Sequence, residues 1–204
     1  MSELLPLFPL PTVVLFPNVF LPLHIFEPRY RAMVTDALED DRRIAMVLLR
    51  PGWEAGYDGR PPIFDIGCSA VIVHSARLDD GRFNIVLQGL DRVRILAEDH
   101  TRPYRLGQVE VVPDAPVAAN ETAAMQGLRA QLITHLGSAY TDSLSAMPDA
   151  ELVHSIAQSF DFEPLEKQAL LEERTLATRT ASLLDLLEMK RLSAGMPGGS
   201  NVTH

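Results

Sequence analysis

The first 26 residues are dominated by short apolar runs that prolines interrupt. The runs cover residues 4–8, 13–16 and 20–25, and prolines stand at positions 6, 9, 11, 17 and 22. Proline has no backbone N–H, so in sheets it is confined to edges, first positions and bulges. Each proline would also cost a membrane-spanning helix about 3 kcal/mol. The pattern predicts edge strands and crossing loops, and it argues against a membrane segment.

The next residues change from a helical spacing to a strand-like one. Pro28 suits the first turn of a helix, and acidic residues at 39–41 end it, because acids are unfavourable at a helix C-terminus. The apolar positions in between fall on one stripe: Tyr30, Met33, Val34, Ala37 and Leu38. A continuous apolar run at 44–49 then predicts a buried strand.

Alternation of apolar and polar residues predicts further strands after a long loop at 50–62. The alternating segments are 64–72, 83–87, 93–97 and 109–111. Four short strands after the proline-rich ones favour a small antiparallel barrel or half-barrel. Gly67, inside one of these strands, predicts a bulge.

Beyond residues 113–119, a hinge of low complexity, the apolar period changes from two to 3.6. Helices are predicted at 125–136, 152–160, 164–171 and 176–192, enough for a bundle of four. The chain is therefore predicted to be an α+β protein, with a β-rich domain at 1–114, a helical bundle at 115–194 and a flexible tail at 195–204.

Composition removes most enzyme classes. Of 204 residues, 47% are hydrophobic and 22% are charged, as in ordinary globular proteins. The single cysteine, Cys68, excludes an internal disulfide, and neither of the two lysines, Lys167 and Lys190, follows a glycine as a phosphate-binding loop requires. The histidines form no metal-ligating pair, and no Gly-x-Ser-x-Gly segment is present. We expect no enzyme, no metal and no cofactor, and a cytoplasmic protein without a basic leader.

Five arginines lie close together in the predicted sheet and raise the question of nucleic acid. They are Arg82, Arg92, Arg94, Arg102 and Arg105. A net charge of −9 disfavours nucleic-acid binding, so a solvated sheet surface balanced by acids is the favoured interpretation, with RNA binding as the alternative. His24, within an apolar run, is interpreted as a hydrogen-bonded edge or core histidine rather than a ligand.

Several segments together resemble a known family. They are Leu-Pro-Leu-Phe-Pro-Leu at 5–10, Val-Leu-Phe-Pro at 14–17, Pro-Leu-His-Ile-Phe-Glu-Pro-Arg-Tyr at 22–30, and further stretches at 66–68, 81–89 followed by Arg92, 103–105 and 162–172. Over residues 3–192 the chain resembles the N-terminal, substrate-binding domain of the ATP-dependent Lon protease. The motif positions are Phe8, Pro9, Phe16, Pro17, Phe26, Glu27, Pro28, Arg29, Tyr30, Gly67, Gly89 and Arg92.

The resemblance implies a PUA-like antiparallel pseudo-barrel with one helix, followed by a helical bundle. It also implies binding of unfolded or tagged polypeptides, or an adaptor role, beside a separate protease or chaperone. We expect a free-standing module without ATPase or peptidase parts, and a homo-oligomer is compatible with it. The motif residues are read as architectural: Glu27 as a helix-start acceptor, and Arg29 and Arg92 as partners of carboxylates.

A surface that binds unfolded chains should be apolar, and captured segments can also extend a sheet edge. Phe16, Phe20, Trp53 and Tyr57 are the candidate peptide-binding residues. For Phe16 and Phe20, burial in the core is the alternative. The rival functions are the RNA-binding module and an enzyme with a small-molecule pocket, to which no motif points.

Overall fold

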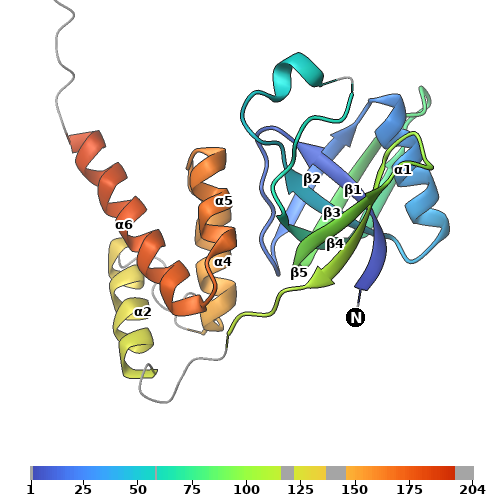
Figure 1. Ribbon diagram of the computed structural model, residues 1–204. Coiled ribbons are helices and arrows are strands. Elements are labelled where there is room, and N and C mark those ends of the chain that lie inside the picture. Colours follow the sequence, from blue (N-terminus) through green and yellow to red (C-terminus); the bar gives the residue numbers. More distant parts are fainter. Residues whose placement is uncertain (1, 58, 116–121, 137–145, 196–204) are drawn as a thin grey trace, which may run out of the picture.

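The computed structural model describes residues 2–57, 59–115, 122–136 and 146–195 (Figure 1). Its strands are β1 (Ser2–Leu10), β2 (Phe20–Ile25), β3 (Arg43–Leu48), β4 (Ile66–Arg77), β5 (Phe83–Asp99) and β6 (Arg105–Val111). Its helices are α1 (Pro28–Glu39), the short η1 (Trp53–Gly56), α2 (Thr122–Leu136), α4 (Asp149–Ser159), α5 (Pro164–Glu172) and α6 (Leu176–Gly195). The predicted α+β class is confirmed, while the predicted tail lies outside the described residues except for Gly195.

The six strands form one sheet in the order β2-β5-β4-β3-β1-β6, and β5 also pairs with β6. That extra pairing closes β5, β4, β3, β1 and β6 into a ring, with β2 added to β5 outside it. The prediction of a purely antiparallel sheet is wrong, because β1 and β3 pair in parallel. Parallel neighbours need a long crossover, and here β2 and α1 lie between them in the chain.

The prolines of β1 do not mark an edge strand, contrary to the sequence prediction. β1 pairs with β6 over Ser2–Leu7 and with β3 over Leu7–Leu10. This stagger means that Pro6 faces only β6 and Pro9 only β3, so each proline has a partner on one side alone. Strand β2, with Pro22, does lie at an edge, as predicted.

The segments 83–87 and 93–97 are one strand, β5, and not two. Gly89, between them, makes room for a crossing segment instead of a turn. A Cβ at Gly89 would lie 2.2 Å from the Phe16 carbonyl oxygen, and the Gly89 N–H donates to Val19 at 2.9 Å. Residues 13–16, the middle apolar run, therefore belong to a crossing loop.

Gly67 also serves close packing, and it is not the bulge that was predicted. A Cβ there would lie 2.4 Å from the Met46 carbonyl oxygen on β3. The register of β4 against β5 shifts later, between Cys68 and Ala70 and again between Ile72 and His74.

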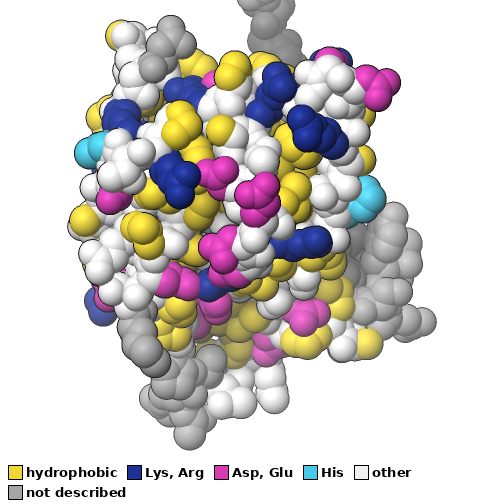
Figure 2. Space-filling model, turned by 90° about the vertical axis from the view of Figure 1, so that its right-hand side faces the viewer, with side chains coloured by type: hydrophobic (Ala, Val, Ile, Leu, Met, Phe, Trp, Pro, Cys, Tyr) yellow, Lys and Arg dark blue, Asp and Glu magenta, His cyan; other side chains and the backbone are white. Residues whose placement is uncertain are grey.

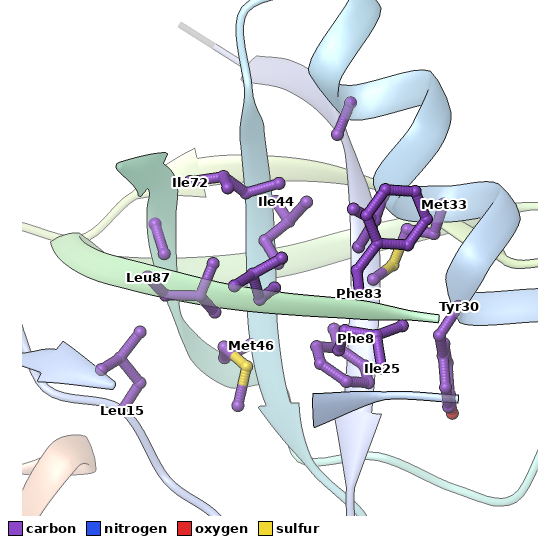
Figure 3. Packing of buried hydrophobic residues seen from close by; sticks show 14 of the residues in the cluster. Phe8, Leu15, Ile25, Tyr30, Met33, Ile44, Met46, Ile72, Phe83 and Leu87 are labelled. Atoms are coloured by element: carbon purple, nitrogen blue, oxygen red, sulfur yellow. The ribbon is translucent and has the colours of Figure 1, made fainter. Parts of the chain in front are cut away.

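Strand β3 is buried on both faces, because adjacent side chains point to opposite sides of a sheet. On one side Ile44 and Met46 join a core that α1 covers with Tyr30 and Met33 (Figure 3). On the other side Ala45 and Val47 pack with side chains of β1, β5 and β6. The molecular surface on the α1 side carries charged side chains of both signs among apolar ones (Figure 2).

The helices after β6 share a third apolar cluster with the strand region. Phe16 and Leu48 contribute from the strand side, and α2, α4, α5 and α6 contribute most of the rest. All four predicted helices are present within the described residues, although Gly137, which follows the first of them, lies outside these residues. The helices therefore pack against the crossing loop and the end of β3.

Candidate functional site

The outer side of β2 presents apolar side chains to solvent. Its residues alternate: Leu21, Leu23 and Ile25 pack toward the core, whereas Phe20 is 58% exposed and Pro22 and His24 are also exposed. In β5 the residues opposite these three are Gln88, Val86 and Asn84. Because β2 pairs with β5 alone, its other edge has no strand partner among the described residues.

On and beside β2 lies a group of mostly exposed side chains that are uncharged apart from histidine, bordered at His24 by the ion pair of Arg82 with Asp80. We call this group the β2 face, and it comprises Phe20, Pro22, His24, Val71, Val73, His74, Asn84, Val86 and Gln88. Val73, at the second register shift of β4, is 43% exposed. Exposed apolar groups that adjoin one another on a sheet mark interaction surfaces more often than isolated ones do.

His24 has hydrogen-bonding partners for both ring nitrogens. Its Nδ1 lies 2.7 Å from Oδ1 of Asn84, and its Nε2 lies 3.2 Å from a guanidinium nitrogen of Arg82. Arg82 is also held by the Asp80 carboxylate at 2.6 Å. The ring stacks on Phe26, which is 60% exposed just beyond the strand. The interpretation of His24 as a hydrogen-bonded edge histidine is confirmed.

Trp53 and Tyr57 form a second aromatic group, on the loop that follows β3. Their rings meet edge-on with centroids 5.4 Å apart, and both side chains are half-buried against the core between β1 and β3. No ring contact joins either of them to Phe20 within the described residues. The predicted peptide-binding residues are therefore divided between two places.

A polar network ties this loop to the start of α1. The Tyr57 hydroxyl donates to Glu27 at 2.6 Å, and Arg29 donates to Glu27 at 3.0 Å and to the Tyr57 carbonyl at 3.1 Å. Burial, then the hydrogen bond to Glu27, raise the pKa of Tyr57. Glu27 is the N-cap residue of α1, as predicted, and its carbonyl oxygen accepts from the Arg31 N–H at 2.9 Å. Its side chain makes no capping bond, because Tyr57 and Arg29 occupy the carboxylate oxygens. The predicted pairing of Arg29 with a carboxylate is confirmed.

Phe16 is fully buried, at 0% exposure, in the cluster between the crossing loop and the helices. Its ring lies 5.8 Å from the ring of His154 on α4. Phe16 is therefore core, the alternative that the sequence left open, and its ring is not offered to a partner.

Two buried arginines hold the helices to the sheet. Arg92 of β5, 4% exposed, pairs with Asp114 at 2.8 Å and donates to the carbonyls of Leu171 and Glu173 at the end of α5. Arg179 of α6, 0% exposed, also pairs with Asp114, at 2.9 Å. Burial alone would raise the pKa of Asp114, but its contacts with both arginines outweigh it and lower that pKa. The predicted pairing of Arg92 with a carboxylate is confirmed.

His154 completes this polar cluster. Its Nδ1 lies 3.1 Å from the Pro17 carbonyl oxygen, and its Nε2 lies 3.2 Å from a nitrogen of Arg179. Burial, then the charge of Arg179, lower its pKa to about 4. Sequence reasoning missed Asp114, His154 and Arg179. The sequence does contain a signal for the burial of Arg179. It stands four residues before Leu183 and eight before Leu187, and therefore on the apolar stripe of α6.

The described residues assemble no recognisable catalytic group. Cys68 is completely buried, and burial raises the pKa of its thiol. The side chains of Lys167 and Lys190 donate hydrogen bonds to the carbonyls of Gln158 and Asp161. No set of three metal-ligating side chains converges in the described chain. None of its helices combines the length and the apolar character that crossing a bilayer requires.

Comparison with known families and sequences gives one consistent match. The family described as ATP-dependent protease La (LON) substrate-binding domain matches residues 4–189. Lon protease 2 of Myxococcus xanthus is 29% identical over 198 residues, which cover 93% of this chain. The Lon protease of Trichlorobacter lovleyi is 30% identical over 197 residues, 91% of this chain. In both cases the chain spans about a quarter of the relative, 24% of its length.

Two solved structures share the fold. The N-terminal domain of the Mycobacterium avium complex Lon protease matches with a TM-score of 0.73 at 18% identity, covering 91% of this chain and 98% of that one. The Lon N-terminal domain protein from Xanthomonas campestris matches with a TM-score of 0.60 at 22% identity, covering 96% and 99%.

Proposed function

Since the chain belongs to the family of ATP-dependent protease La (LON) substrate-binding domains, we propose that it binds other polypeptides in extended form on the β2 face and along the free edge of β2. Unfolded or tagged polypeptides are the proposed clients, and the chain acts as their recognition module for a protease or chaperone. No catalytic step is assigned to the described residues.

The free edge of β2 is the observation that carries the proposal. An exposed strand edge offers backbone N–H and C=O groups that an extended segment can pair with, whatever its side chains are. Pro22 supplies a carbonyl but no N–H, so one donor is missing from this edge. Because one backbone hydrogen bond is missing, an added strand is bound weakly and reversibly. The same gap limits edge-to-edge pairing between two copies of this chain.

The β2 face supplies the apolar part of the contact. Phe20 and Pro22 lie two residues apart on the same side of β2 and can contact alternate side chains of a strand added at its free edge, and Val86 lies behind Pro22 on β5. Burying a Phe side chain completely is worth roughly 1.5–3 kcal/mol, so the half-exposed ring of Phe20 can contribute about 1 kcal/mol. Such a contact discriminates by apolar character and not by sequence, as a recogniser of unfolded chains requires.

RNA binding, the alternative function, is not favoured by the arginines on which it depended. Each of the five is paired with a carboxylate: Arg82 with Asp80, Arg92 with Asp114, Arg94 with Glu110, Arg102 with Asp36 and Arg105 with Glu98. Arg92 and Arg105 are also buried, so the five do not share an outward face. The mixture of both charges in Figure 2 agrees with this pairing. Phosphate backbones are bound by unbalanced basic surfaces.

We further infer that the closed ring of strands with α1 is a PUA-like pseudo-barrel and that 1–114 and 115–194 are two domains, the second a helical bundle. Two apolar clusters that lie within the strand region and α1 support this division, although the third joins the helices to the crossing loop and to the end of β3. The ion pairs of Asp114 with Arg92 and Arg179 lie at the proposed boundary.

A titration with a capped, fluorescently labelled peptide built from Leu, Val, Phe, Ser and Gly tests the proposed site. We expect Phe20→Ser to weaken binding about fivefold, which is the loss of about 1 kcal/mol. The matched control is Leu96→Ser, another exposed apolar residue, 49% exposed on the second half of β5, which should leave binding unchanged.

Two outcomes would contradict this assignment. A wild-type Kd weaker than about 1 mM, or about 4 kcal/mol, would remove polypeptide binding as the function. If Trp53→Ala abolished binding while Phe20→Ser did not, the aromatic loop and not the β2 face would be the site.

A further inference from the structure

We propose that His24 makes capture on the β2 face depend on pH, so that the face accepts an apolar segment while His24 is neutral and releases it when His24 is protonated. The inference rests on the proposed function and concerns the regulation of the same site. It follows from the two hydrogen bonds of the His24 ring and from its position at the end of the β2 face, between uncharged side chains and the guanidinium of Arg82.

The contacts of His24 specify one neutral form of the ring. A guanidinium nitrogen only donates hydrogen bonds, so Nε2, 3.2 Å from Arg82, must be the acceptor and carry no proton. Nδ1 then carries the proton and donates it to Oδ1 of Asn84 at 2.7 Å. A doubly protonated ring cannot keep both contacts, because its Nε2–H would point at an N–H of Arg82.

Protonation would also place a second positive charge beside Arg82. The carboxylate in contact with that arginine is Asp80, which accepts hydrogen bonds from the backbone N–H and from the Nε of Arg82. Arg31 of α1 adds a further cation, since it packs against the turn at Gly81.

The remaining titratable groups around His24 offer no compensating negative charge. On the α1 side the oxygens of Glu27 are occupied by Tyr57 and Arg29. On the β4 side the titratable member of the β2 face is His74, opposite Val86. Among these described neighbours no unengaged carboxylate contacts the His24 ring.

A charged ring on this face opposes the docking of an apolar segment. The segment would cover the imidazolium and strip it of water, and burying an unpaired charge is far more costly than burying a neutral ring. Histidine is the side chain whose charge changes between pH 5 and 8. If only the neutral ring permits docking, the apparent Kd rises as the fraction of protein with a protonated His24 increases.

The experiment measures binding of the same capped peptide, which has no titratable group, at about pH 7.5 and about pH 5.5. The wild-type protein should bind at least about fivefold more weakly at the lower pH. His24→Gln should bind equally at both, because the Gln amide can donate to Asn84 and accept from Arg82 but cannot be charged. His74→Gln is the matched control and should keep the wild-type pH dependence.

The results separate the two proposals. Absence of binding at the higher pH overturns the proposed function itself. Binding that is insensitive to pH in the wild type, or that remains sensitive in His24→Gln, overturns this inference and leaves the peptide site standing. Near-ultraviolet circular dichroism at both pH values checks the fold, and the lower pH stays above the pKa of about 4 of the buried His154.

Discussion

The protonation state of one buried residue, His154, affects the stability of the fold. His154 lies between the crossing loop and α6, and it is held neutral by burial and by the neighbouring cation of Arg179. The sequence around it, within an apolar helix stripe, indicates burial. The sequence does not indicate that Arg179 of α6, 25 residues further along the chain, lies beside His154.

We expect His154 to lower the stability of the protein in acid. Its pKa is about 4 in the folded chain and about 6.5 in the unfolded chain, so between these values the unfolded state binds the extra proton. Stability therefore falls as the pH drops through this window and is fully present above it. The loss at about pH 5 amounts to about 2 kcal/mol. Urea unfolding at pH values from 7 to 5 measures it, and His154→Gln should remove most of this slope; an unchanged slope would exclude His154 as its source.

At the scale of elements, the crossing segment before β2 depends on one glycine of β5. Gly89→Ala would place a methyl group 2.2 Å from the carbonyl oxygen of Phe16, in contact with backbone that cannot rotate away. We expect a loss of about 1–3 kcal/mol in chemical denaturation.

Gly127→Ala provides the control for this change. Gly127 stands within α2, and a Cβ there meets nothing within 4 Å, so the same substitution should raise stability by about 1 kcal/mol through helix propensity. If both variants changed stability in the same direction, the close approach at Gly89 would not be the cause.

Elements with a clear local period could be predicted from the sequence, and those defined by tertiary contact could not. The stripe from Tyr30 to Leu38 indicates α1, and the four helices after residue 120 follow from their spacing. The pairing of β1 on both sides could not be foreseen, because the stagger that accommodates Pro6 and Pro9 is a property of three strands together. The continuity of β5 through Gly89 likewise depends on a loop distant in sequence.

At the scale of the whole molecule, one carboxylate links the strands to the helices. Asp114→Asn would leave Arg92 and Arg179 buried with no negative partner in direct contact among the described residues. Removing one member of a buried ion pair costs about 3–5 kcal/mol, and the partial exposure of Asp114 places the expected loss near the lower end. Hydrogen exchange should quicken first in α5 and α6, whose carbonyls and side chains the arginines hold.

Glu110→Gln is the comparison for this variant. It removes an exposed ion pair with Arg94 on the same sheet, and such pairs contribute less than about 1 kcal/mol. Equal losses in the two variants would show that Asp114 is an ordinary surface charge.

The candidate site could be predicted only in part. Phe20 and the Trp53–Tyr57 pair stand out in the sequence as apolar or aromatic residues near loops and edges. Their separation into two places depends on tertiary packing of the loop after β3, and the crossing loop that carries the buried Phe16 lies against Gly89. The lack of charge on the β2 face could not be read from the sequence either, because its members come from three strands joined by particular registers.

Strand β5 has a mechanical consequence. It carries β2 along its first half, and its second half holds Arg92, which grips the end of α5. If a captured chain lay along β2 and were pulled lengthwise, the force would act in shear on all backbone hydrogen bonds between β2 and β5 at once. Strands pulled in shear separate less easily than strands whose hydrogen bonds break one after another. The pull would then pass along the backbone of β5 and through the Arg92 side chain to the carbonyls at the end of α5.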